Sequence, residues 1–128
     1  MSRNLKILIV EDEVLTAIVM KKKLENAGYQ VAQSVTTGED AVLTVKEMTI
    51  DIVLMDIRLA GEIDGIEAAT KIQNLREIPI IFLTGYNDAE TKKRANALEP
   101  LAILIKPVEM TDVVNILERI QGDNSKKG

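Results

Sequence analysis

The sequence predicts an α/β domain, a flavodoxin-like three-layer sandwich built on a five-stranded parallel sheet. Short apolar runs, each suited to a strand that is buried on both faces, recur along the chain. Segments whose apolar residues have helical spacing separate these runs, and strands that alternate strictly with helices form parallel sheets with right-handed crossovers. Five strands and five helices of this kind favour the strand order 2-1-3-4-5.

Composition places the chain among globular proteins and limits its chemistry. Of its 128 residues, 46% are hydrophobic and 28% are charged, and the net charge is −4. A general nucleic-acid-binding face needs a basic surface, so direct nucleic-acid binding is not expected. The chain has no Cys and no His, which excludes disulfides, zinc sites and triads that use either residue. Any metal is therefore a hard ion with oxygen ligands.

The two ends of the chain flank one expected domain. Arg3 and Lys6 lead straight into a short apolar run, so neither a signal peptide nor a membrane span is indicated. We assign residues 1–121 to a single domain and residues 122–128 to a polar C-terminal tail without periodicity. The chain is therefore expected to be cytoplasmic, with no membrane contact.

The first half of the chain contains two expected strands and two expected helices. An apolar run at 5–10 ends at the acids of 11–13, which we place at a helix start because the helix dipole favours negative charge there. Gly28 is a signal for the end of that helix. A second strand is expected at 30–35 and a second helix at 39–48.

The second half continues the alternation from the apolar run 52–55, which Asp56 closes. A glycine-containing loop follows, and further along Pro100 stops the fourth helix because proline cannot continue the helical hydrogen bonds. The elements expected here are a third strand ending at 56, a helix from 65, a strand at 79–84, a helix at 88–98, a strand at 101–105 and a last helix that ends before 122.

Four strand ends meet at one crevice in the predicted strand order, and such a crevice is where open α/β sheets carry their ligands. Taken singly, the residues there have plainer explanations: acids at a helix start, a turn residue and a solvated lysine. Their coincidence at four separate strand ends favours a functional site. The residues delivered are Glu11 and Asp12 after the first strand, Asp56 after the third, Thr84 after the fourth and Lys106 after the fifth.

These five side chains suit phosphoryl chemistry. Carboxylates that crowd together repel each other, so at neutral pH they need a cation or must take up protons. Mg²⁺ is the reasonable partner, because it binds one or two carboxylates and keeps waters or phosphate oxygens. Lys106 supplies a point charge for a phosphoryl oxygen, and Thr84 can donate a hydrogen bond to another. Asp56 could then act as a nucleophile and form an aspartyl-phosphate.

From 6 to 121 the sequence resembles the receiver domain of bacterial and archaeal response regulators in two-component signalling. The motifs are specific together, although each one alone is weak. They are I-L-I-V-E-D-E at 7–13, I-V-L-M-D-I at 52–57, D-G-I-E-A at 64–68, F-L-T-G at 82–85 and I-K-P at 105–107.

The resemblance implies a role for each residue of the crevice. Asp56 is expected to be the phosphoacceptor and to hold Mg²⁺ together with Glu11, Asp12 and the backbone carbonyl of Arg58. The other implied roles are a switch hydroxyl for Thr84, a phosphoryl-binding charge for Lys106 and a cis peptide bond between Lys106 and Pro107.

Three departures from the family pattern concern how the switch is tuned. Ile103 stands where receivers commonly carry Tyr or Phe, so we expect it to pack passively. The loop R-L-A-G-E-I-D-G at 58–65 is one residue longer than usual and lacks the usual proline, and strand 5 lacks the acids that many DNA-binding regulators use to dimerise. We expect Arg58 and Tyr86 to shield an aspartyl-phosphate from water, and Tyr86 to relay movement of Thr84 to the fourth helix.

The leading hypothesis is a signalling switch. Asp56 takes a phosphoryl group from the phosphohistidine of a sensor histidine kinase or phosphotransfer protein, which alters the surface of helix 4, strand 5 and helix 5 for an unknown protein target. Such a domain catalyses only its own phosphorylation and dephosphorylation, so it is not an enzyme in the usual sense. A weak homodimer is compatible with this hypothesis.

One alternative is a small Mg²⁺-dependent phosphatase or phosphotransferase, although Arg58 occupies the place of the second Asp that such enzymes usually need. Another is a phosphorylation-independent interaction module, which would not need three clustered acids.

Overall fold

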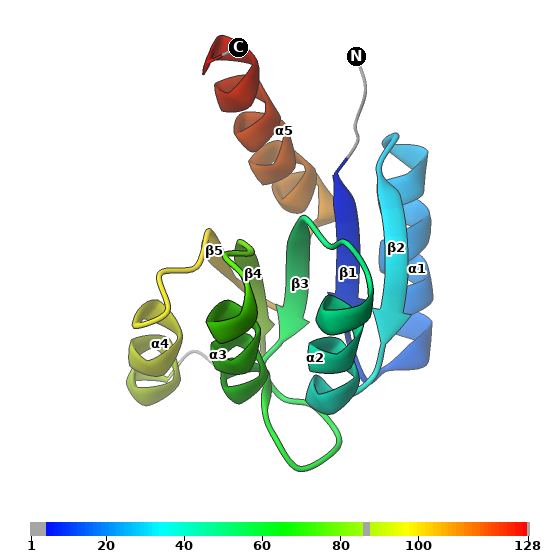
Figure 1. Ribbon diagram of the computed structural model, residues 1–128. Coiled ribbons are helices and arrows are strands. Elements are labelled where there is room, and N and C mark those ends of the chain that lie inside the picture. The colour runs from blue at the N-terminus through cyan, green and yellow to red at the C-terminus, as the bar shows by residue number, and fades with distance from the viewer. Residues whose placement is uncertain (1–4, 86–87, 128) are drawn as a thin grey trace.

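The computed structural model describes residues 5–85 and 88–127, with side chains described up to 121. Strands and helices alternate along the chain, as Figure 1 shows. The strands are β1 (Lys6–Val10), β2 (Gln30–Val35), β3 (Ile52–Asp56), β4 (Ile80–Thr84) and β5 (Ala102–Ile105). The helices are α1 (Val14–Asn26), α2 (Gly38–Glu47), α3 (Gly65–Leu75), α4 (Ala89–Asn96) and α5 (Met110–Lys127). Within the described part of the chain, no helix has the length and apolar character that crossing a membrane requires.

The five strands form one parallel sheet in the order β2-β1-β3-β4-β5, which confirms the predicted topology. The register aligns the carboxyl ends of the strands: Val10 of β1 pairs with Met55 of β3, and Thr84 of β4 pairs with Ile105 of β5. Consequently the residue that follows each of these strands lies at the same edge of the sheet. That edge is where the sequence predicted a site.

Helices cover both faces of the sheet and create two separate apolar layers (Figure 1). α1 and α5 pack on one face, where Leu24 and Leu117 are fully buried. α2 and α3 pack on the other, where Val45 and Ile72 are fully buried and Ala95 of α4 joins them. β3 and β4 lie in the middle of the sheet, so every residue of both strands is buried. The central strands therefore hold their terminal residues, Asp56 and Thr84, in a rigid frame.

Side-chain caps begin the helices on the α2–α3 face. Thr37 accepts a hydrogen bond from the backbone N–H of Asp40 at 3.1 Å, so α2 begins at Gly38, one residue earlier than expected. Asp64 and Glu67 form a reciprocal capping box at the start of α3. Each cap satisfies backbone N–H groups that have no partner within the helix.

The boundaries of α1 and α5 also differ from the sequence expectation. α1 begins at Val14, so the acids expected in its first turn lie outside the helix, and the carboxylate of Glu11 instead accepts a hydrogen bond from the N–H of Glu13. α5 continues to Lys127, through the segment expected to be a tail. A segment in which apolar residues do not recur at helical spacing offers no apolar face for packing. Its backbone can nevertheless continue a helix. A single glycine such as Gly122 makes helix formation less favourable by about 1 kcal/mol relative to alanine, which does not end the helix.

Candidate functional site

Buried polar side chains gather at the carboxyl edge of the sheet. Among the described residues, four polar or charged side chains are buried, namely those of Glu11, Thr44, Asp56 and Thr84. Three of them lie at this edge: Glu11 directly follows β1, Asp56 ends β3 and Thr84 ends β4. Burying carboxylates costs free energy unless they are paired or hydrogen-bonded, so their placement here indicates a site with specific partners.

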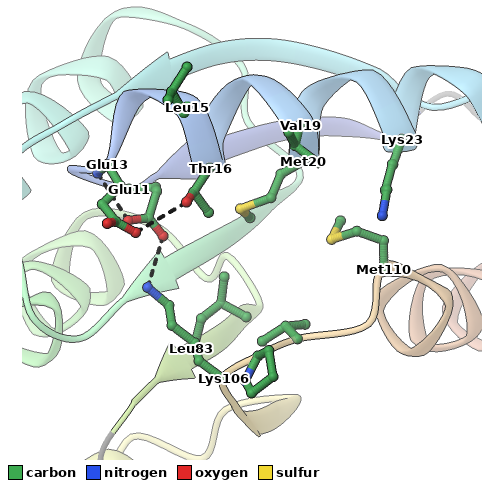
Figure 2. Close-up of a pocket in the computed structure, with 12 residues that line it drawn as sticks. Glu11, Glu13, Leu15, Thr16, Val19, Met20, Lys23, Leu83, Lys106 and Met110 are labelled. Carbon is green, nitrogen blue, oxygen red and sulfur yellow. Dashed lines mark hydrogen bonds and ion pairs between the residues drawn. The ribbon is translucent and has the colours of Figure 1, made fainter.

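Lys106, the residue after β5, joins two of these carboxylates. Its Nζ lies 3.0 Å from Oε1 of Glu11 and 2.8 Å from Oδ2 of Asp56. Figure 2 shows the Lys106 side chain reaching across the sheet edge to Glu11. Burial would by itself lower the pKa of Lys106, but the hydrogen bonds to Asp56 and Glu11 outweigh it, and the pKa is raised above its usual value. The lysine is therefore held as a cation between the two acids.

Glu11 is the most strongly buried charged group of the site, with none of its surface exposed. This burial raises the pKa of its carboxyl above the usual value, because the charged form loses its hydration. Hydrogen bonds from the N–H of Glu13 and from Lys106 oppose the shift, and the negative charge of Asp56 adds to it. A second cation near Glu11 and Asp56 would relieve this repulsion.

The chemistry of the acidic cluster fits Mg²⁺. Glu11, Asp12 and Asp56 each offer one carboxylate oxygen, and these three atoms lie within 4.8 Å of one another. Glu11 and Asp56 are buried, whereas Asp12 is exposed at the mouth of the site. Mg²⁺ prefers such hard oxygen ligands and keeps waters where the protein offers few. The structure thus brings together the three acids that the sequence singled out.

The structure places three of the other residues to which the sequence assigned a role, namely Arg58, Ile103 and Lys106. The backbone N–H of Arg58 donates to Oδ1 of Asp56 at 3.2 Å, while the exposed side chain of Arg58 acts electrostatically on the carboxyl of Asp88. Ile103 pairs with Phe82 in the sheet and packs against the α2–α3 layer. The Lys106–Pro107 peptide bond is cis, as expected. Tyr86 lies outside the described residues, so its shielding and relay roles stay predictions.

Gly65 is a residue of the site whose role the sequence did not reveal. It opens α3, and a Cβ at this position would collide with the backbone carbonyl oxygen of Asp56. Its N–H donates to the carbonyl of Ile57 at 2.7 Å. A glycine directly after a helix-capping aspartate was the available signal, but only the tertiary fold brings the start of α3 against the end of β3. Gly65 thus permits close packing directly behind Asp56.

This fold and this edge chemistry define a class of signalling protein. The family model of the response regulator receiver domain matches residues 7–118, and the chain belongs to that family. Receiver domains are signalling switches rather than classical enzymes, which leaves the small-phosphatase alternative without support. They generally bind Mg²⁺ at an acidic site and interact with histidine kinases or phosphotransfer proteins.

The chain also resembles particular regulators. It is 31% identical over 113 residues to the transcriptional regulatory protein PdtaR of Mycobacterium tuberculosis, a match that covers 88% of this chain and 55% of that protein. It is 34% identical to the transcriptional regulatory protein ZraR of Escherichia coli K12, over 91% of this chain and 26% of that protein. The chain therefore spans about half of PdtaR and about a quarter of ZraR.

Solved structures show the same architecture. The signal receiver domain of a modulated diguanylate cyclase from Desulfovibrio desulfuricans G20 superposes with a TM-score of 0.87 at 34% identity, covering 98% of this chain and 99% of that one. A CheY-like receiver domain protein from Methanospirillum hungatei JF-1 superposes with a TM-score of 0.88 at 26% identity, covering 98% and 99%. Both comparisons extend the likeness over nearly the whole chain.

Proposed function

We propose that Asp56 accepts a phosphoryl group from the phosphohistidine of a sensor histidine kinase or a phosphotransfer protein, with Mg²⁺ held by Glu11, Asp12 and Asp56. One observation carries the proposal: the buried carboxylate of Asp56 is already oriented by two donors. Its Oδ1 accepts from the N–H of Arg58 and its Oδ2 accepts from Lys106. Fixing a nucleophile in one orientation lowers the entropy cost of reaching the transition state.

The transfer needs few groups from the protein. An oxygen of Asp56 attacks phosphorus, the P–N bond to the donor imidazole breaks, and its electron pair stays on that nitrogen. Lys106 and the hydroxyl of Thr84, both beside the sheet edge, stabilise the charge on the phosphoryl oxygens. The bound metal ion, with the carbonyl of Arg58 as a further ligand, would neutralise part of that charge. Hydrolysis of the aspartyl-phosphate returns the domain to its resting state.

A phosphoryl group on Asp56 would redistribute the contacts of the site. Lys106 would exchange Oδ2 of Asp56 for a phosphoryl oxygen, and Thr84 would turn toward the new charge. These two residues end β4 and follow β5, so their movement reaches the surface of α4, β5 and α5 first. α4 is suited to respond, because Ala95 is the one buried residue within it. We propose that this surface is read by a downstream protein target.

The surface of α1 beside the site supports a protein phosphodonor. Val14, Leu15, Ile18 and Val19 are between 50% and 79% exposed, and they lie within the first half of α1. An apolar groove continues from Leu15 and Val19 toward Met110 at the start of α5, as Figure 2 shows. Contiguous exposed apolar side chains of this kind mark interaction sites. A donor helix seated on α1 would bring its phosphohistidine to the neighbouring acids.

Mass spectrometry can test the proposal. The protein is incubated with acetyl phosphate and Mg²⁺, and wild type is compared with Asp56→Asn. We expect one phosphoryl adduct in wild type and none in Asp56→Asn, since an amide oxygen cannot serve as the nucleophile. An adduct that persists in Asp56→Asn would mean that another residue is the phosphoacceptor.

A further inference from the structure

The loop 57–64, which leaves the phosphoacceptor strand, is held at its far end by α2. Ala60 forms an isolated parallel bridge with Thr37, the N-cap residue of α2. Two residues further along the loop, the backbone N–H of Glu62 donates to Oε2 of Glu39 at 3.0 Å. Glu39 lies in the first turn of α2, so the start of this helix binds the loop at residues 60 and 62.

Glu39 is fitted closely to the loop. Gly61 has φ +97°, a conformation that favours glycine, and a Cβ built on it would lie 2.7 Å from Oε1 of Glu39. Hydrogen bonds from backbone N–H groups, first its own and then that of Glu62, hold the pKa of the Glu39 carboxyl below its usual value. The carboxylate is therefore ionised when it binds the loop, and charge-assisted hydrogen bonds are the stronger kind.

The other end of the same loop belongs to the phosphoryl site. Ile57 donates its N–H to the carbonyl of Leu83 at 3.0 Å, and its own carbonyl accepts from Gly65 at 2.7 Å. Arg58 donates its N–H to Asp56, and its carbonyl is the further metal ligand in the proposed function. A backbone displaced at 60–62 would move Arg58, because only one residue separates Arg58 from Ala60. The contacts of α2 with residues 60 and 62 therefore limit the positions that the backbone of Arg58 can take.

We propose that Glu39 is a positioning residue for the Mg²⁺ and phosphoryl site, acting through the loop 57–64. The inference rests on the proposed function, since it concerns the same metal site. The loop lacks proline and contains a glycine, so it has more backbone freedom to lose than a proline-stiffened loop would have. Glu39 supplies the restraint from outside the loop.

The test compares three variants with wild type. Glu39→Ala removes the acceptor, whereas Glu39→Gln keeps an oxygen that can accept from Glu62 but loses the charge. Glu47→Ala removes an exposed charge at the other end of the same helix. Hydrogen exchange of the metal-free proteins reports the loop, and isothermal titration calorimetry with Mg²⁺ reports the site.

We expect faster exchange of the 59–63 amides in Glu39→Ala. The Kd for Mg²⁺ should rise by up to about tenfold, the lower end of the effect of losing a direct partner of a metal ligand, because Glu39 acts on Arg58 only through the loop. Glu39→Gln should change both measurements less than Glu39→Ala does, because a neutral oxygen still accepts from Glu62 but forms the weaker bond. Glu47→Ala should stay near wild type in both. Equal weakening in Glu39→Gln and Glu39→Ala would overturn the positioning role in favour of a long-range charge effect. So would an unchanged Kd in Glu39→Ala.

Gly61→Ala probes the same contact from the loop side. The added Cβ meets Glu39 and is strained at this φ, so the variant should weaken Mg²⁺ binding as Glu39→Ala does. Combined with Glu39→Ala, it should weaken binding by less than the product of the two single effects. Fully multiplicative effects would contradict a shared mechanism. A wild-type protein that binds no Mg²⁺ would remove the proposed function and this role together, whereas normal wild-type binding with an indifferent Glu39→Ala removes this role alone.

Discussion

At the residue scale, Lys106 holds two buried acids together. It contacts Glu11, which follows β1, and Asp56, which ends β3, at the same time. Removing one partner from such a group leaves uncompensated charge, which costs more than the pair contributes while intact. The cation of Lys106 therefore stabilises the resting site by compensating the charge of the two acids.

Lys106→Met should lower the free energy of unfolding in metal-free buffer. We expect a loss of about 1–2 kcal/mol, less than the roughly 3–5 kcal/mol of fully buried pairs, because Lys106 is partly exposed. Mg²⁺ should recover part of the loss by neutralising the same acids. Urea denaturation with EDTA and with Mg²⁺ measures both, and Lys71→Met, at an exposed lysine of α3, is the control. Equal losses in the two variants would contradict the role of Lys106.

Asp88, the N-cap of α4, predicts a pH dependence at the residue scale. Its carboxylate accepts from the N–H of Thr91 at 3.0 Å, and this bond holds the pKa of Asp88 below 3.8. Because the folded pKa is lowered, the cap contributes stability above about pH 3.8 and loses it as pH falls through the folded pKa. The amide proton shift of Thr91, followed by NMR, should titrate with a midpoint below 3.8. Asp88→Asn should flatten that titration, and a midpoint above 3.8 would be the contrary result.

At the element scale, Asp64 ties two helices together. One carboxylate oxygen caps α3 by accepting from Glu67 at 2.8 Å, and the other pairs with Arg94 of α4 at 3.0 Å. α4 is a short helix with one buried residue, and this exposed ion pair is one of the contacts that connect it to α3. The helix expected to move during switching is thus linked to the loop that begins after Asp56, the proposed phosphoacceptor.

Two substitutions at Asp64 separate these roles. Asp64→Ala loses the cap and should lower the free energy of unfolding by about 1 kcal/mol. Asp64→Asn keeps a good capping oxygen and should cost much less, while losing the charge that attracts Arg94. Thermal unfolding measures stability, and hydrogen exchange of α4 should rise in both variants. Slow α4 exchange in Asp64→Asn would show that the ion pair does not restrain α4.

At the scale of the whole molecule, the exposed apolar face of α1 and the acidic site are continuous. Leu15 is 79% exposed on this face, and α1 starts two residues after Asp12. The proposed protein donor would cover this surface when it reaches Asp56, whereas a small phosphodonor would not. The two kinds of donor should therefore respond differently to a change on α1.

Leu15→Glu should slow phosphotransfer from a purified histidine kinase by about tenfold, the effect of removing a moderate interface hot spot. Phosphorylation by acetyl phosphate should remain unchanged, because Leu15 is not part of the acidic site. The matched control is Leu43→Glu, at an exposed leucine of α2 on the opposite face of the sheet. Equal slowing with the kinase and with acetyl phosphate would mean that the substitution damages the site rather than a docking surface.

The fold could be predicted from the sequence, and so could the residues that the sheet brings to one edge. A buried strand is recognised in the sequence as a short apolar run, and the polar residue at its C-terminal end is evident. Asp56, Thr84 and Lys106 could be identified in this way. A parallel sheet with right-handed crossovers leaves few orders for five strands, which is why local patterns were sufficient to bring those residues to one edge.

The contacts that hold this edge in place could not be predicted from the sequence, because they join segments that the fold brings together. The bond between Glu39 and Glu62 spans 23 residues, and the one between Asp64 and Arg94 spans 30. Neither follows from periodicity, because exposed acids and arginines look alike in a sequence until the fold supplies a partner. The same holds for α1, whose expected first-turn acids lie outside the helix because the end of β1 keeps Glu11 in the buried site. Local propensity selects elements, whereas hydrogen bonds between distant segments set their limits and their positions.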